Sequence, residues 1–481
     1  MKDGYYEVRH GLPNHLNYEI PEFTHMSYLV ARLLTSLNLY LCHLDNTWMD
    51  FKDKTVAFAT LGCKLNFSET STIARSFEEK GFKRVNSKEK ADVYVINTCS
   101  VTDTADKKSK TVIRQVAKLN PAAFIVVTGC YAQLKPEEAA GIDGVDLVIG
   151  ANDKFNITKY LENLEKHQDG EVHTCAFGEI SEFQHAFSFG DRTRSFLKVQ
   201  DGCNYFCTYC TIPMARGKSR NPSIESLVNE AHNVAEQGIR EIILTGVNIG
   251  DFGQSTGENF LELIKALDEV ETLGRIRIGS VEPNLLTDEI INFMAESKRI
   301  APHFHIPLQA GTDDVLHLMK RRYTTALFAQ RVSRIRELLP EAFIGVDLIA
   351  GMNGESEELF EKAYQFIEGL DISALHVFPY SERKNTRALK IEGVVTIEQR
   401  RHRAQCLIQL SEHKHKAFCE RNIGRMEAVL FENEKSKGFM QGWTSNYIKV
   451  ETQYRPELLN EFRTVKLCGL NENGTMNISF D

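Results

Sequence analysis

Three cysteines in the middle of the chain, Cys203, Cys207 and Cys210, have the spacing C-x3-C-x2-C. Three thiolates this close together can ligate three iron atoms of a cubane [4Fe–4S] cluster, which leaves the fourth iron without a protein ligand. Clusters that only carry electrons are usually held by four cysteines. An iron atom that is one ligand short can bind a small molecule, so the spacing indicates a cluster that takes part in a reaction.

A zinc site, a disulfide framework and inert core thiols agree less well with this spacing. A structural zinc site needs four ligands, commonly as two C-x2-C pairs, and no second pair lies nearby. A disulfide framework is unexpected because 481 residues contain only 11 cysteines, an odd number. Buried inert thiols are common singly, but three within eight positions are improbable as chance core residues.

Composition limits the class of protein. The length of 481 residues predicts several domains, and 42% hydrophobic with 25% charged residues is ordinary for a globular protein. The formal charge of −8 gives no global sign of nucleic-acid binding, so an RNA-binding surface must be local and DNA is not expected as a partner. No apolar run is long enough for a bilayer, and we expect no secretory signal. We therefore expect a cytoplasmic location and no membrane partner.

Residues 52–165 alternate between strand-like and helix-like runs, which predicts a parallel sheet covered by helices. The clearest strands are Thr55–Leu61, Asp92–Asn97 and Phe124–Thr128, with Val145–Ile149 as a fourth. Each of the first three ends in a cysteine, namely Cys63, Cys99 and Cys130. The carboxyl ends of parallel strands share one edge of a sheet, so these thiols should converge there. They form a second candidate three-thiolate site, the alternative being cysteines that only pack in the core.

A second alternating block covers residues 193–420, after a Gly-containing linker at 166–192. Its six strands predict an α/β fold with a partial (β/α)6 barrel, in which chemistry belongs at the carboxyl ends of the strands. Cys203, Cys207 and Cys210 follow the first of these strands, as this arrangement requires. The six are Phe196–Gln200, Glu241–Thr245, Arg275–Ser280, His303–Pro307, Ile344–Ile349 and Ala374–Phe378.

The two ends of the chain differ from these blocks. Residues 421–481 read as short strands between turns, which predicts a small antiparallel β-barrel of a kind that often binds RNA. The expected strands are Glu427–Phe431, Tyr447–Thr452, Thr464–Cys468 and Met476–Phe480. Within it, Trp443 and Tyr447 are candidates for stacking on bases or for the core. The adjoining stretch Arg400–Arg425 carries an excess of Lys and Arg, including Lys414 and Lys416, and is either a phosphate-binding surface or a solvated helix face. Residues 1–51 are expected to be an N-terminal extension that is either poorly ordered or lies before the true translation start.

The cysteine spacing, with the aromatic Tyr209 before the last cysteine, resembles the radical S-adenosylmethionine (SAM) enzymes. The order of the three blocks further resembles the methylthiotransferases, which end in an RNA-binding β-barrel called TRAM. The segments that carry this resemblance are Thr60-Leu-Gly-Cys63-Lys-Leu-Asn66, Asn97-Thr-Cys99-Ser-Val-Thr, Thr128-Gly-Cys130-Tyr-Ala-Gln, Ile212-Pro-Met-Ala-Arg216-Gly-Lys-Ser-Arg220, His305-Ile-Pro-Leu-Gln309-Ala-Gly311-Thr and Val377-Phe-Pro-Tyr380-Ser. One departure is Asn385, where the family often has glycine; Asn also tolerates a left-handed backbone.

The resemblance implies two [4Fe–4S] clusters and SAM as cofactors. The site at Cys203, Cys207 and Cys210 would cleave SAM to a 5′-deoxyadenosyl radical, and the site at Cys63, Cys99 and Cys130 would hold the sulfur to be transferred. Tyr209 would lie near the adenine of SAM, and Arg216 beside the cofactor or the RNA. His305 and Gln309 would either contact the cofactor or pack inside the barrel.

The residue directly after Cys63 is a lysine, Lys64. In this position the chain resembles the branch of the family that acts on N6-threonylcarbamoyladenosine at position 37 of the tRNA anticodon loop. Other branches act on isopentenyladenosine in tRNA or on a ribosomal-protein aspartate, and these remain alternatives. A non-catalytic Fe–S or zinc RNA-binding protein is the alternative from another class. The implied reaction also needs an electron donor such as flavodoxin or ferredoxin.

Overall fold

The computed structural model describes residues 51–161, 164–167, 169–190, 193–436 and 438–480. The hypothesis about the N-terminal extension therefore concerns residues that lie outside the described part of the chain, except for Phe51. Phe51 is buried and stacks on Phe82, with the ring centroids 4.4 Å apart. It belongs to the core of the first sheet and not to an extension.

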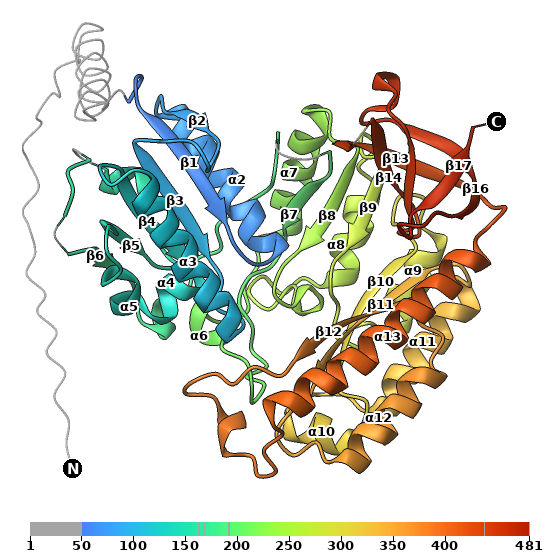
Figure 1. Cartoon of the computed structure of the whole chain (residues 1–481). Coiled ribbons are helices and arrows are strands. Elements are labelled where there is room, and N and C mark those ends of the chain that lie inside the picture. The colour runs from blue at the N-terminus through green and yellow to red at the C-terminus, as the bar shows by residue number, and fades with distance from the viewer. Residues whose placement is uncertain (1–50, 162–163, 168, 191–192, 437, 481) are drawn as a thin grey trace, which may run out of the picture. The chain divides into compact units, whose positions relative to one another are not determined.

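The first sheet is parallel throughout, in the order β2-β1-β3-β4-β5-β6, with helices over it (Figure 1). Its strands are β1 (Thr55–Thr60), β2 (Lys83–Val85), β3 (Val93–Thr98), β4 (Phe124–Gly129), β5 (Leu147–Ile149) and β6 (Glu171–His173). Its helices are α2 (Lys64–Glu79), α3 (Asp103–Leu119), α4 (Cys130–Leu134) and α5 (Pro136–Ala140). The sequence analysis did not predict β2 and β6. Strand β6 lies in the stretch that we expected to be a linker.

The predicted partial barrel is present as two three-stranded parallel sheets, β7-β8-β9 and β10-β11-β12. Parallel bridges from Ile276 to Ile300 and from Ser280 to His305 join them. The strands are β7 (Ser195–Lys198), β8 (Glu241–Thr245), β9 (Arg275–Ile278), β10 (His303–Gln309), β11 (Phe343–Ala350) and β12 (Ala374–Pro379). The helices are α6 (Ile212–Arg216), α7 (Ile224–Glu236), α8 (Phe260–Asp268), α9 (Asp288–Glu296), α10 (Asp313–Leu318), α11 (Thr325–Leu338) and α12 (Glu357–Gly369). All six predicted strands are confirmed.

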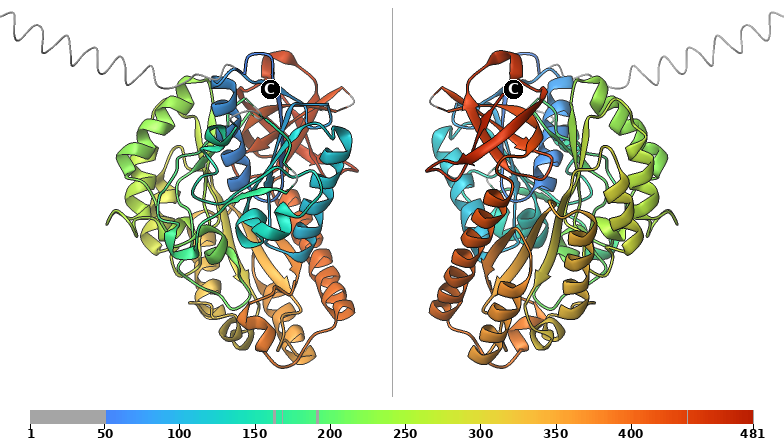
Figure 2. Two further views of the ribbon diagram at one scale, coloured as in Figure 1. Left: turned by 90° about the vertical axis from the view of Figure 1, so that its left-hand side faces the viewer. Right: turned by 90° about the vertical axis from the view of Figure 1, so that its right-hand side faces the viewer.

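Helix α13 (Ile397–Arg421) leads from this barrel to a closed five-stranded barrel at the C-terminus (Figure 2). The strands, in barrel order, are β13 (Met426–Ser436), β14 (Phe439–Thr444), β15 (Lys449–Gln453), β17 (Met476–Ser479) and β16 (Phe462–Leu470). Four of the five pairings are antiparallel as expected, whereas β15 pairs with β17 in parallel. The sequence missed β14 because Gly438 and Gly442 interrupt its pattern. Within the described residues, no helix is long and apolar enough to span a membrane.

A buried ion network joins the C-terminal barrel to the partial barrel. Glu241 on β8 accepts hydrogen bonds from Arg275 and Arg277 on β9, at 2.5 and 3.1 Å. Arg275 also donates to the carbonyls of Ala428 and Trp443 in the C-terminal barrel, and Arg277 does so to those of Thr444 and Ser445. One carboxylate therefore holds two guanidinium groups in the positions that dock the second barrel.

Glu241 should make stability depend on pH. Although burial raises its pKa, the neighbouring arginines, Arg275 foremost, outweigh this effect and lower the pKa to about 2. A depressed folded-state pKa stabilises the fold above the unfolded value of about 4.5 and loses that stabilisation as pH falls towards 2. We expect the stability difference between wild type and Glu241→Gln, about 3 kcal/mol at neutral pH, to shrink across this window in chemical denaturation. The exposed Glu361→Gln is the control, and a difference that stays constant down to pH 2 would contradict the assignment.

Candidate active site

The loop that carries Cys203, Cys207 and Cys210 is fixed by a buried glutamine. The Gln200 side chain donates to the carbonyls of Asp201 and Gly202, at 3.0 and 2.7 Å, and to Ser219. Its oxygen accepts from the backbone amides of Val247 and Asn248, beyond the end of β8. Gln200 thus ties the loop to the neighbouring strand, and no sequence pattern singled it out.

The three cysteines of this loop lie together at the carboxyl end of β7. Burial raises the pKa of Cys203 to about 11 and that of Cys210 to about 12, and the Cys207 thiol contributes to both shifts. The Arg321 guanidinium donates to Cys207 Sγ at 3.0 Å. A free, clustered three-thiol set with a cation beside it fits an anionic [4Fe–4S] cluster held at three irons.

Arg321 and its partners are functional candidates that the sequence analysis missed. Arg321 forms an ion pair with Glu282, and its Nε lies 3.0 Å from the Tyr323 hydroxyl. That hydroxyl lies 2.6 Å from the carbonyl oxygen of Pro307 on β10. Glu282 and Arg321 therefore place a carboxylate and a guanidinium beside the cysteine loop, the two charges needed to hold an amino acid such as the methionine part of SAM.

The other predicted cofactor residues in the barrel, Tyr209, His305 and Gln309, occupy different surroundings. Tyr209 packs against the barrel core, where burial holds its pKa well above the usual value, and it is close enough to Arg321 to feel its charge. His305 Nε2 lies 2.7 Å from Asp347 Oδ1, which also contacts His376 Nδ1 at 3.4 Å. Gln309 ends β10 with a left-handed backbone, φ 65°. Direct contact of these three with SAM stays a prediction.

Arg216 is buried, and this excludes one of its two predicted roles. It is 3% exposed and donates to Glu69 at 2.9 Å, to Asp201 at 3.0 Å and to Asn66 at 2.7 Å. The buried guanidinium cannot contact RNA, so the expectation that Arg216 lies beside the RNA is wrong. Its charge lowers the pKa of Cys130, whereas burial raises it. Arg216 therefore lies near the second cysteine site.

The expected convergence of Cys63, Cys99 and Cys130 is confirmed. Cys63 precedes α2, Cys99 follows β3, and Cys130 begins α4. Burial raises the pKa of Cys99 to about 11, with further contributions from Cys130 and Cys63. Gly62 has φ +101°, and a Cβ there would lie 2.9 Å from Cys99 Sγ. The backbone at Gly62 thus leaves room for a three-thiolate cluster site, which these free cysteines fit.

A buried ion network connects the two cysteine sites. Glu69 on α2 pairs with Lys154 and Lys198 as well as with Arg216. Asp201, two residues before Cys203, pairs with Lys198, Arg216 and Arg220. Four cations therefore face two carboxylates, and the excess positive charge complements anionic clusters on either side.

Cys63 opens into a cavity of about 630 Å³ that three parts of the chain line. The first sheet supplies Cys63 and Lys64, β7 and the residue before it supply Phe196 and Arg194, and the C-terminal barrel supplies Trp443 and Tyr447. We call this space the Cys63 cavity. Its position beside a cluster site makes it the natural place for a substrate.

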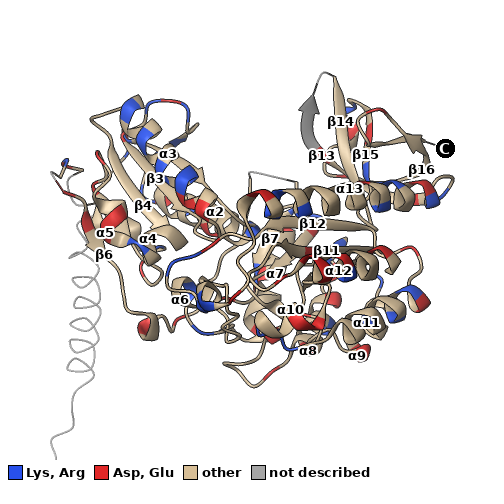
Figure 3. Cartoon of the chain, turned by 60° about the horizontal axis from the view of Figure 1, so that its bottom comes forward, with Lys and Arg blue, Asp and Glu red and all other residues tan. Residues whose placement is uncertain are grey.

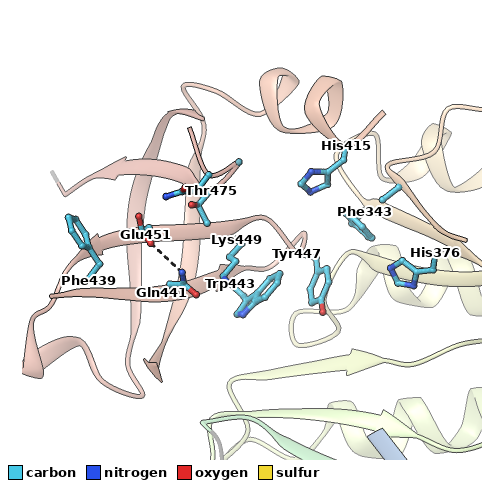
Figure 4. Close-up of a pocket in the computed structure, with 13 residues that line it drawn as sticks. Phe343, His376, His415, Phe439, Gln441, Trp443, Tyr447, Lys449, Glu451 and Thr475 are labelled. Carbon is cyan, nitrogen blue, oxygen red and sulfur yellow. Dashed lines mark hydrogen bonds between the residues drawn. The ribbon is translucent and has the colours of Figure 1, made fainter. Parts of the chain in front are cut away.

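A second cavity, of about 730 Å³, continues along the C-terminal barrel and shares Trp443 and Tyr447. Figure 4 shows Tyr447 between Trp443 and His376. The rings of Trp443 and Tyr447 lie 4.5 Å apart at 23°. Both predicted aromatic residues are thus half-buried cavity walls, where an unstacked base can lie on them.

Part of the basic stretch Arg400–Arg425 is engaged inside the protein, whereas Arg401, Lys416, Arg421 and Arg425 are exposed. Figure 3 shows Lys and Arg on α13 and Asp and Glu on the neighbouring α12. Arg400 and Arg403 are buried and pair with Glu382 and Glu355. Lys414 donates to the carbonyls of Glu368 and Leu370 at the end of α12, at 2.9 and 2.7 Å. The phosphate-binding interpretation is therefore wrong for these residues.

Replacing Lys414 by methionine should leave the salt dependence of tRNA binding unchanged. Each lost phosphate contact lowers the slope of log affinity against log salt by roughly 1, but the Lys414 ammonium is already bound to carbonyls. Arg401→Met is the matched variant, since Arg401 is exposed and has no ion pair among the described residues. A slope reduced by roughly 1 in Lys414→Met would show that Lys414 does reach phosphate.

The two barrels, the cysteine loop and the first sheet define a radical-SAM enzyme with an additional cysteine site. Residues 197–367 match the radical SAM superfamily, and residues 55–150 match the uncharacterized protein family UPF0004. The chain is 39% identical over 421 residues to threonylcarbamoyladenosine tRNA methylthiotransferase MtaB of Bacillus subtilis (strain 168), covering 86% of this chain and 93% of that relative. The protein belongs to the methylthiotransferase family of radical-SAM enzymes.

Two further comparisons extend this finding. The tRNA-2-methylthio-N(6)-dimethylallyladenosine synthase of Thermodesulfovibrio yellowstonii (strain ATCC 51303 / DSM 11347 / YP87) is 30% identical over 421 residues, covering 87% of this chain and 96% of that relative. The radical S-adenosylmethionine methyltransferase TsrM from Kitasatospora setae superposes with a TM-score of 0.51 at 13% identity, covering 89% of this chain and 85% of that chain. The second likeness concerns the fold alone.

Proposed function

We propose that this enzyme converts N6-threonylcarbamoyladenosine at position 37 of tRNA to its 2-methylthio derivative. The observation that carries the proposal is the Cys63 cavity, in which one thiol of the second cysteine site faces cationic and aromatic side chains. The relative named for this activity, at 39% identity, supports it. When bound, the two [4Fe–4S] clusters would supply an electron to cleave SAM and a site for the sulfur that is transferred.

The residues of the chain bind and position the reactants. Glu282 and Arg321 offer opposite charges beside Cys207 for the amino-acid part of SAM. Trp443 and Tyr447 line the cavity in which an adenine that has left the anticodon-loop stack would lie. A bound anticodon loop would cover the Cys63 cavity and so keep water away from a radical reaction, which prevents side reactions.

The proposed partners follow from the reaction. The substrate is the tRNA anticodon loop, and the electron comes from a donor such as flavodoxin or ferredoxin. We propose a cytoplasmic location, because that is where such a donor and tRNA meet. Neither DNA nor a membrane has a part in the reaction.

A second candidate keeps the chemistry and changes the substrate to isopentenyladenosine. The 30% identical relative named for the dimethylallyl nucleoside favours it. An apolar substituent, however, would leave the ammonium of Lys64 in the Cys63 cavity without an anion, whereas Arg194 is already paired with Glu432. The charged substituent of threonylcarbamoyladenosine agrees better with these walls.

Mass spectrometry of tRNA nucleosides from cells with and without the gene tests the proposal. We expect loss of the methylthio form of threonylcarbamoyladenosine and accumulation of the unthiolated nucleoside. Loss of methylthio-isopentenyladenosine instead would identify the second candidate. If neither nucleoside changes, a ribosomal-protein aspartate becomes the substrate to examine.

A further inference from the structure

The walls of the Cys63 cavity are electrostatically one-sided. Lys64, Arg84 and Arg194 line it, and none of the described lining residues is acidic. The rest of the wall consists of aromatic, aliphatic and hydroxyl-bearing side chains, the Cys63 thiol and Gly62. A cavity of this size, with cations and no carboxylate, is suited to a ligand that is partly aromatic and carries a negative charge.

Lys64 directly follows Cys63 of the cluster site and lines the cavity. In the described part of the chain it makes no hydrogen bond and no ion pair. The Asp347 carboxylate is close enough to influence it, but that carboxylate is engaged by His305 at 2.7 Å and His376 at 3.4 Å. Lys64 therefore has three donors available to a ligand in the cavity.

Arg194, directly before β7, supplies a second donor in the wall of the cavity. Its Nε donates to Glu432 at 2.8 Å, which fixes the plane of the guanidinium. Its Nη1 is buried and makes no hydrogen bond, although it lies 3.9 Å from the Glu241 carboxylate. A buried N–H without a partner costs free energy comparable to a lost hydrogen bond, unless a ligand accepts it.

We infer that Lys64 and Arg194 bind the carboxylate of the threonyl group on the substrate base, and so select this nucleoside over one with a neutral substituent. The inference rests on the proposed function and assigns its specificity. A carboxylate accepts hydrogen bonds from both cations at once. With the carboxylate held there, the adenine lies in the same cavity as Cys63, Trp443 and Tyr447.

Equilibrium binding of short RNAs tests the inference without turnover. The probes are synthetic anticodon stem-loops with threonylcarbamoyladenosine, its methyl ester or plain adenosine at position 37, measured by fluorescence anisotropy with reconstituted wild-type enzyme. We expect the free acid to bind about tenfold to a hundredfold more tightly than the ester, the range for hydrogen bonds between charged groups. Lys64→Met should lose most of this preference, Lys64→Arg should retain it, and the exposed Lys362→Met should not change it.

Two checks separate the ways in which this result can fail. Since Lys64 follows a cluster cysteine, iron content is measured for each variant, and Arg194→Lys, away from the cysteines, should also weaken the preference severalfold. Wild-type enzyme that binds acid and ester equally, or Lys64→Met with the full preference, would overturn the inference. If wild type still methylthiolates the acid-bearing stem-loop in that case, the proposed function stands; if it does not, the function itself fails.

Discussion

Replacing Cys207 by alanine is expected to abolish the reductive cleavage of SAM, whereas replacing Cys99 should leave cleavage in place and abolish methylthio transfer. The reason is the separation of the two cysteine sites on different sheets. Cys207 belongs to the loop after β7, with Arg321 at 3.0 Å, and Cys99 follows β3 in the first sheet. The measurements are 5′-deoxyadenosine and methylthio-nucleoside from one reaction, by mass spectrometry.

Each variant should also lose roughly half of the bound iron, because a cubane site that lacks one of three thiolates is not retained. Cys468→Ala is the matched control, since this cysteine is exposed on the C-terminal barrel. Loss of both products in Cys99→Ala with full iron at the other site would show that the two sites are not independent.

The elements and the cysteine sites could be predicted from the sequence because their signals are local. The six strands of the partial barrel are short β-branched runs with helical periods between them, and burial on both faces makes such runs conspicuous. The convergence of Cys63, Cys99 and Cys130 followed from strand direction alone. Asn385 adopts φ 66°, as expected for an asparagine in a turn that often has glycine.

The partners of the charged residues could not be predicted from such local signals. Arg403 and Lys414 lie on one helix in a run of basic residues, yet their partners are Glu355 and the carbonyl of Leu370. Arg216 looked like a ligand-binding residue, but the structure places Glu69, 147 positions away, against it. Such pairings depend on how separate sheets pack together, and the spacing of residues in the sequence does not show which of them come into contact.

Replacing Glu69 by glutamine is the second change with a large expected effect, a loss of about 3–5 kcal/mol in the free energy of unfolding. Glu69 is fully buried, and Arg216, Lys154 and Lys198 outweigh the effect of burial, so they hold its pKa far below the usual range. An amide in its place leaves these cations without their shared anion. Denaturant unfolding at neutral pH measures the loss, and the exposed Glu78→Gln on the same helix is the control.

The same substitution should also affect the reaction in a way that simple destabilisation does not. A buried ion pair is seldom the most stable solution for a core, but it can fix one arrangement of the parts that it joins. Glu69 joins α2, which begins beside Cys63, to Arg216 and Lys198 of the partial barrel. At a temperature where Glu69→Gln is still folded, we therefore expect less methylthio product per 5′-deoxyadenosine formed. An unchanged ratio would mean that Glu69 contributes to stability and not to the distance between the two cysteine sites.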